Sequence, residues 1–298
     1  MNGSTKPGYY GHPMIKPPEW TDLIPVYFWA GGMSGASATM ALMQRLRGNE
    51  PLATTYVYAA AVGTALSGFC LIADLKRPDR FMNMLRVFKP TSPMSMGVYI
   101  FSVFGGATMT AALCSLFGVA KPLGRIAEVV AGFVGPLMSV YTAVLISDTV
   151  VPAWYGARLA MPALFAATSA STAGGVGLLF GPADANSSAR RLALMGGAAV
   201  PVTLQNVHRA VGPFQDRAYK DGQAGPLAHA ARAMNIAGTV CALFAGRAPV
   251  LGRVAGALLL AGGLAERFAV LRAGCNSASD PAYTIHAQRS GVSSADGS

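Results

Sequence analysis

Residues 77–97 have the sequence RPDRFMNMLRVFKPTSPMSMG, a basic segment punctuated by prolines. Apolar runs flank it at residues 54–75 and 93–118, and each is long enough for a helix to cross a bilayer, which takes about 20 residues. Only 12% of the chain is charged and 52% is hydrophobic, whereas soluble domains are roughly 25% charged. The mean hydropathy is +0.41. We therefore predict an all-α, polytopic membrane protein.

Eight apolar runs are candidates for transmembrane helices. They cover residues 23–46, 54–75, 93–118, 126–147, 160–180, 192–211, 228–245 and 250–271. An even number places both termini on one side of the membrane, called side A here, with side B opposite. The predicted transmembrane domain is 23–272, between a polar segment, 1–22, and a tail, 273–298, whose Ser-rich end is predicted to be disordered. Segment 1–22 has no apolar core like that of a signal peptide, so we expect the first span to be retained.

Charge and reactive residues exclude several classes of function. The net charge of +10 lies mainly in the loops, which is typical of contact with lipid headgroups and of membrane topology rather than of nucleic-acid binding. Basic loops occur on both sides, so they do not predict an orientation. The four Cys residues are isolated and no His lies in mid-membrane. We therefore expect no iron-sulphur cluster, haem or metal held by this chain alone.

Small residues in the first run predict close helix packing. The sequence AGGMSGASA at residues 30–38 places Gly31 and Gly35 in a GxxxG pattern. This spacing lets helix backbones approach closely in lipid.

Polar residues at the ends of the predicted spans gather on side A. Asp22 precedes the first span, Asp74 closes the second and Asp148 closes the fourth. Tyr141 lies two helical turns before Asp148, so both face the same way, and Tyr141 would be about 10 Å deeper in the membrane. Each acid could simply pair with a loop Arg and cap its helix. Three acids and a phenol at one end favour a functional site there.

Five segments together resemble the NrfD/PsrC family, the membrane subunits of polysulphide-reductase-type molybdoenzymes. Segment 74–97, DLKRPDRFMNMLRVFKPTSPMSMG, is the most specific, because it is close to the loop between the second and third helices of that family. The others are YYGHPMIKPPEW (9–20), IPVYFWAGGMSG (24–35), YTAVLISDTVVPAW (141–154) and RFAVLRAGCNSASDPAYTIHAQR (267–289).

The resemblance implies eight helices in two four-helix bundles, of which helices 1–4 hold a quinone site, in the cell membrane. It implies menaquinone or ubiquinone as the cofactor, with no haem and no iron-sulphur cluster in this chain. The implied partners are a four-cluster ferredoxin-like iron-sulphur subunit, a molybdopterin catalytic subunit and membrane lipid, with no nucleic acid. The chain would be a quinone-reactive or non-catalytic subunit of the oxidoreductase complex.

The resemblance also assigns candidate site residues. By position, Asp22, Tyr27 and Tyr141 match the family's quinone contacts, although one family member carries Asn and His in the first-helix region where this chain has Asp22 and Pro25. Asp74 matches an acid at the end of the second helix, and Asp74 and Asp148 are the candidates for a proton relay.

The same resemblance places the basic loop on side A beneath the iron-sulphur subunit. There we expect a short amphipathic helix on the membrane surface. Its basic side chains would meet an acidic partner or lipid phosphates; they are Arg77, Arg80, Arg86 and Lys89.

Two alternative functions stay open at this stage. A secondary transporter would use Gly- and Pro-interrupted helices to build a central site, and it predicts charged groups at mid-membrane. A purely structural anchor would bind no quinone, and changes at Tyr141 or Asp74 would then have no effect.

Overall fold

The computed structural model describes the chain except for residues 1–14, 17, 19, 87, 184–185 and 286–298, and the side chains of Arg80 and Met82 are also outside the description. The described residues form no strand. Their α-helices are α1 (Leu23–Leu46), α2 (Glu50–Ala73), α3 (Pro93–Phe117), α4 (Lys121–Ser147), α5 (Pro152–Gly156), α6 (Met161–Phe180), α7 (Ser187–Gln215), α8 (Ala224–Phe244) and α9 (Pro249–Ser279). Two 3₁₀ helices, η1 (Pro78–Arg86) and η2 (Asp216–Tyr219), lie between them.

The fold class predicted from the sequence is confirmed: the protein is an all-α, multi-pass membrane protein. Within the described residues, six helices are long and apolar enough to cross a membrane, namely α2, α3, α4, α6, α8 and α9. Helices α1 and α7 are of similar length but are not among these six. In α1 the polar residues Ser34, Ser37 and Gln44 are buried against other helices, so α1 does not need an apolar surface there. The count of eight spans stays a prediction.

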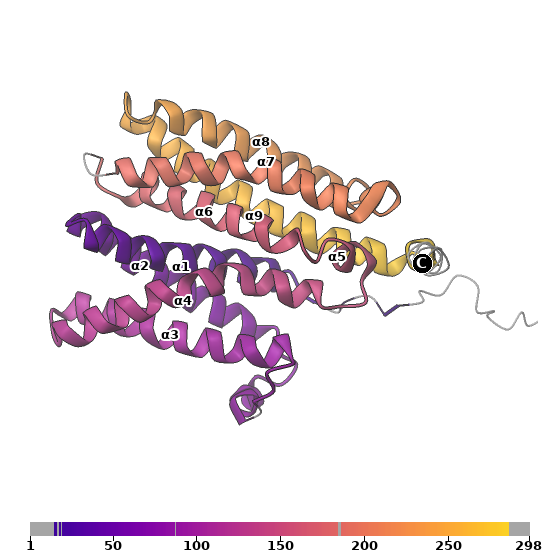
Figure 1. Cartoon of the computed structure of the whole chain (residues 1–298), viewed down its shortest axis with the longest axis horizontal. Helices are drawn as coiled ribbons and strands as arrows, with labels where there is room; N and C mark the ends of the chain where they lie inside the picture. Colours follow the sequence, from indigo (N-terminus) through magenta and orange to yellow (C-terminus); the bar gives the residue numbers. More distant parts are fainter. Residues whose placement is uncertain (1–14, 17, 19, 87, 184–185, 286–298) are drawn as a thin grey trace, which may run out of the picture.

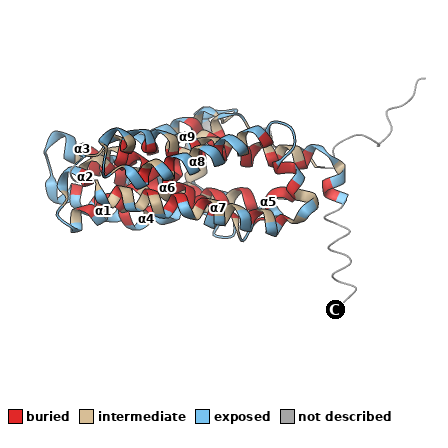
Figure 2. Cartoon of the chain, turned by 90° about the horizontal axis from the view of Figure 1, so that it is seen from above, coloured by how far each residue is buried: buried red, intermediate tan, exposed pale blue. Residues whose placement is uncertain are grey.

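The long helices fall into two groups of four (Figure 1). In the N-terminal group, α1 packs on α2 and α4, and α3 packs on α4. In the C-terminal group, α6 packs on α7 and α9, and α8 packs on α9. Helices α1 and α6 join the groups, which Figure 2 shows as buried residues along the middle of the molecule. In the apolar windows, 72% of α6 is buried but only 22% of α8, so α6 is central and α8 is peripheral.

The sequence marks where several helices begin and end. Asn49 and Ser92 accept hydrogen bonds from the backbone N–H groups of Leu52 and Ser95, respectively, and so cap the first turns of α2 and α3. Pro residues in the first turns of α2, α3 and α4 cost no hydrogen bond, because N–H groups there have no partner within the helix. Gly118 ends α3 with φ 67°, a left-handed conformation that glycine adopts without strain.

Glycines of α1 allow very close contact with its neighbours. A Cβ on Gly35 would overlap the carbonyl oxygen of Gly135 in α4, and a Cβ on Gly32 would overlap the hydroxyl of Ser169 in α6. Across the α1–α4 contact, Ser139 Oγ donates to Gly32 O at 3.2 Å. These contacts place α1 at the centre of the molecule.

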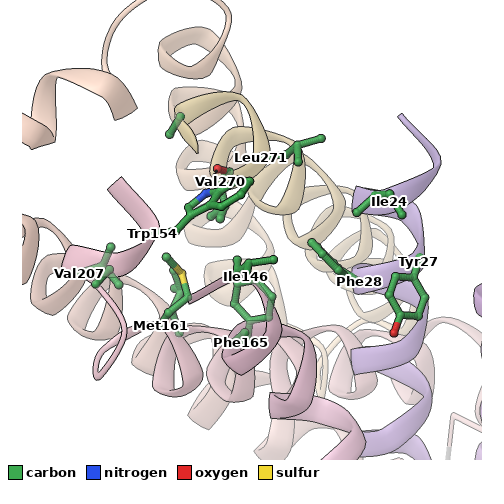
Figure 3. Packing of buried hydrophobic residues seen from close by; sticks show 14 of the residues in the cluster. Ile24, Tyr27, Phe28, Ile146, Trp154, Met161, Phe165, Val207, Val270 and Leu271 are labelled. Carbon is green, nitrogen blue, oxygen red and sulfur yellow. Dashed lines mark hydrogen bonds between the residues drawn. The ribbon is translucent and has the colours of Figure 1, made fainter. Parts of the chain in front are cut away.

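Helix α1 begins and α9 ends at the end of the molecule where α5 lies, which corresponds to side A (Figure 1). Trp154 of α5 donates a hydrogen bond from Nε1 to Val270 O of α9 at 2.9 Å (Figure 3). The Trp154 ring also stacks on Trp20, with ring centroids 5.4 Å apart. Asp22 pairs with Arg272 at 2.6 Å. The first and last helices are therefore joined at side A.

On side B, the α1–α2 and α3–α4 turns are joined by a charge network. Glu128 is buried, and both of its carboxylate oxygens accept from Arg45 at 3.0–3.2 Å. Glu50 pairs with Arg45 and with Arg125. On side B, therefore, Glu50 and Glu128 have a structural role, because each pairs with Arg residues at the ends of the helices.

We predict that Gly35→Ala lowers the free energy of unfolding by about 1–3 kcal/mol, the usual cost of overpacking, because the new Cβ would overlap the α4 backbone. Gly106→Ala in α3 is the matched control, since its Cβ would meet no atom within 4 Å and Ala favours a helix over Gly by about 0.8–1.0 kcal/mol. Thermal unfolding of the purified variants measures both. Equal stability of the two variants would contradict this account of the α1–α4 contact.

Candidate functional site

A cavity of about 360 Å³ lies at side A, within the N-terminal group of helices. This size lies within the usual range of small-molecule sites, about 300–1,000 Å³. Its walls are mainly apolar and come from α1, α2, η1, α3 and α4. The lining residues include Ile24, Phe28, Leu71, Leu75, Phe81, Met84, Leu85, Met94, Val98, Phe101 and Leu145. The cavity therefore suits a largely apolar ligand.

The basic loop forms one wall of this cavity. Its apolar side chains Phe81, Met84 and Leu85 line the cavity, whereas Arg77 and Arg86 are exposed. The predicted short amphipathic helix is thus present as η1. Tyr99 of α3 holds η1 in place by donating its hydroxyl to Leu85 O at 2.9 Å.

Two phenols reach the cavity from different helices. Tyr27 comes from α1 and is 2% exposed, and Tyr141 comes from α4. The two hydroxyl groups interact with each other. Gly97 of α3 lies against the Tyr141 ring, where a Cβ would overlap the ring. The absence of a side chain at Gly97 therefore leaves the space that Tyr141 occupies.

Asp74 lies at the end of α2 and lines the same cavity. Its Oδ1 accepts two hydrogen bonds from Thr21, at 3.2 Å from the backbone N and at 2.5 Å from Oγ1. Oδ2 takes no part in these two bonds. Asp74 thus holds Thr21, just before the start of α1, and places a carboxylate at the side-A end of the cavity.

Asp22 and Asp148 do not line this cavity. Asp22 turns to Arg272 of α9 and forms an exposed ion pair. Asp148 is exposed at the C-terminal end of α4. The structure therefore brings Tyr27, Tyr141 and Asp74 together and leaves the other two candidates outside.

Several residues with structural roles carry no clear signal of those roles in the sequence, or were not among the predicted site residues. Trp20 lines the cavity and stacks on Trp154, and Gly97 makes room for Tyr141. In α9, Glu266 and Arg267 form a buried ion pair at 2.5 Å. Two adjacent charges inside the apolar run at 250–271 were a visible signal for that pair.

Among the described residues, no group of three or more His, Cys, Asp or Glu side chains could hold a metal ion. The polar side chains that line the cavity include two phenols, from Tyr27 and Tyr141, and one carboxylate, from Asp74. This set can donate hydrogen bonds to an acceptor and exchange a proton with water.

One protein-family model matches the chain, and its description is "Polysulphide reductase, NrfD". The match covers residues 14–183, more than half of the 298 residues. It includes all the residues that line the side-A cavity and ends before α7. No curated protein matches the chain.

We predict that Asp74→Ala releases the segment before α1, because Thr21 loses the one oxygen that accepts both of its hydrogen bonds. Hydrogen bonds to charged groups contribute about 1.5–3 kcal/mol, so the Thr21 amide should exchange its hydrogen at least about tenfold faster. Hydrogen–deuterium exchange with mass spectrometry measures this. Asp74→Asn keeps an acceptor oxygen and is the matched control, with exchange close to wild type. Unchanged exchange in Asp74→Ala would show that Thr21 is held by other contacts.

Proposed function

The chain belongs to the NrfD polysulphide reductase family, the membrane subunits of polysulphide-reductase-type complexes, and from this we propose that it exchanges electrons and protons between the membrane quinone pool and an iron-sulphur partner subunit. That partner would be a four-cluster ferredoxin-like protein, and it would connect this chain to a molybdopterin catalytic subunit. The catalytic subunit would determine the substrate of the complex.

The side-A cavity is the observation that carries the proposal. A quinone head group is flat and apolar with two carbonyl acceptors. The cavity offers apolar walls, about 360 Å³ of space and two phenol donors. Phe81 and Met94, which line it, are also exposed, so an apolar ligand would meet an apolar surface on entry. The residues present therefore fit a quinone, either menaquinone or ubiquinone.

A bound quinone supplies two-electron, two-proton redox chemistry. In the proposed mechanism, Tyr27 and Tyr141 donate hydrogen bonds to carbonyl oxygen and so orient the head group. Tyr27 is buried and Tyr141 partly buried, which limits the access of water to that end of the cavity. Asp74 lies between the cavity and side A and holds a proton that is exchanged with water. Electrons would pass directly to or from the nearest cluster of the partner, without a redox carrier in this chain.

The exposed charges of the basic loop suggest where the iron-sulphur partner docks. Arg77, Arg86 and Lys89 are exposed beside the cavity. Charged surfaces mainly set the rate, register and salt dependence of docking. An acidic surface on the partner would place its nearest cluster close to the side-A cavity.

We predict that Tyr141→Phe weakens quinone reactivity while the complex stays intact. The change removes one hydroxyl and keeps the ring, and a hydrogen bond of this kind contributes about 0.5–1.5 kcal/mol. Quinone binding should therefore weaken by roughly two- to tenfold. The assay is electron transfer between the purified complex and a soluble quinone analogue, with artificial-dye activity of the catalytic partner as control.

In the same assay, Asp74→Asn should slow turnover more than it weakens quinone binding, because an amide keeps the shape but cannot carry a proton. Dye activity should be normal in both variants, since the catalytic subunit is unchanged. Wild-type quinone reactivity in both variants would contradict the proposed site and favour a purely structural anchor.

We also predict that Arg77→Glu together with Arg86→Glu releases the iron-sulphur subunit and leaves this chain in the membrane. The matched control reverses two exposed side-B residues, Arg247 and Arg253, and should leave the complex intact. Affinity purification from native membranes at increasing salt measures retention of the partner. If the side-A double variant keeps its partner at high salt, the loop contacts lipid and not the partner.

A further inference from the structure

A second, much smaller cavity lies in the C-terminal group of helices, between α6, α7, α8, α9 and η2. Its volume is about 40 Å³. Most of its wall is apolar, but polar residues also line it: Thr168, His208, Tyr219, Arg232, Asn235 and Glu266. All of its lining residues except Thr168 lie outside the residues matched by the family model, and it shares no lining residue with the side-A cavity.

Glu266 is the polar group in this wall that lacks a full set of partners. It is 6% exposed, and its Oε2 accepts from Arg267 at 2.5 Å. Its Oε1 is buried and has no hydrogen-bond partner among the described residues. Thr168 lies beside the Glu266 carboxylate in the same wall, but its one hydroxyl proton is donated to Leu164 O at 2.8 Å and so is not available to Oε1. A buried carboxylate oxygen without a donor is unfavourable, so Oε1 requires either water or a proton of its own.

Arg267 does not depend on Glu266 alone. Its Nη2 donates to Phe165 O at 3.2 Å. Its guanidinium carbon lies 3.5 Å from the centroid of the Phe165 ring, which is a cation–π contact. These two contacts hold the guanidinium when Glu266 is neutral. Protonation of Glu266 therefore need not displace Arg267.

The size of the cavity determines its occupant. A water molecule needs about 10–15 Å³ of such space, so a cavity of about 40 Å³ holds roughly three water molecules. A quinone head group or a lipid chain is far too large. A bare metal cation would have one carboxylate as ligand and the Arg267 guanidinium beside it, which is unfavourable.

His208 connects the cavity with side A. It lines the cavity, its side chain is 33% exposed, and its Nδ1 pairs with Oδ1 of Asp216. The second oxygen of Asp216 pairs with Lys220. The phenol of Tyr219 donates to Ala153 O at 3.2 Å, and burial, with the charges of Glu266 and Asp216, raises the pKa of Tyr219 above its usual range. His208 is thus both accessible to water and adjacent to the cavity.

Titratable and charged groups surround Glu266 from α7, α8, α9 and η2, whereas α6 lines the cavity with Thr168 alone. These groups are Arg267 of α9, His208 of α7, Arg232 of α8, Asp216 and Tyr219 of η2, and Lys220 beyond η2.

We propose that this cavity holds a small water cluster and that Glu266 is a proton-binding site, loaded from side A through His208. A proton from side-A water passes to the His208–Asp216 pair, then through the cavity waters to Oε1. One O–H bond breaks at the donating water and one forms at Glu266, with no oxidation or reduction. The second group of helices would then store a proton on the same side as the quinone cavity.

Infrared difference spectra between two pH values, on the full chain in lipid nanodiscs, test the proposal. The expected result is a pH-dependent carboxylic-acid C=O band that shifts in D₂O and is lost in Glu266→Gln. Glu128→Gln is the matched control, because Glu128 is equally buried but both of its oxygens accept from Arg45. Absence of the band in wild type, or its loss in Glu128→Gln but not in Glu266→Gln, would overturn the proposal.

Two further variants keep the charge pair and so test the site even if Glu266→Gln fails to fold. His208→Gln should keep the band but make it appear severalfold more slowly after a pH jump. Ala231→Val adds two methyl groups at the cavity wall and should also slow the response by displacing water. Wild-type kinetics in both variants would overturn the proposed route through His208 and the cavity waters.

Discussion

Close approach between helix backbones is the constraint on which the rest of this structure depends. Helices in lipid gain little from burying apolar side chains against one another, so packing and interhelical hydrogen bonds hold them together. In α1, Gly35 brings the backbone against Gly135 of α4. Tyr27 and Tyr141 each lie roughly two helical turns from this contact, toward side A. The phenols meet in one cavity because the glycines set the distance between their helices.

Much of the fold could be predicted from apolar length. Helix α1 has the predicted bounds, 23–46, because the apolar run ends where the helix ends. Helix α9 continues to Ser279, well past the predicted end at 271, because protein contacts replace lipid there: Asn276 donates to Ala218 O, and Ser277 accepts from the Ala153 N–H. Hydropathy cannot mark an end that tertiary contacts determine.

The candidate site was less predictable, because the local sequence shows which residues are polar but not which neighbours their side chains contact. Asp74 and Asp22 have the same local signal, an acid at a span end, yet Asp74 lines the cavity and Asp22 turns to Arg272. That choice depends on a residue 250 positions away. The role of Gly97 is equally hidden, since it depends on the ring of Tyr141 in another helix. The Glu266–Arg267 pair was visible as two charges in an apolar run, but its cavity is formed by four helices and η2.

The contact between Trp20, Trp154 and Val270 has a consequence for how the protein is made. Trp20 lines the side-A cavity, yet it stacks on an indole that is hydrogen-bonded to α9, which follows the other long helices of the described residues. During synthesis, α1–α4 precede α9, so the wall at Trp20 is completed only when α9 has been inserted. A truncated or stalled chain therefore lacks the finished side-A surface. Insertion of α9 is therefore required before Trp20 can take up its place in the wall of the side-A cavity.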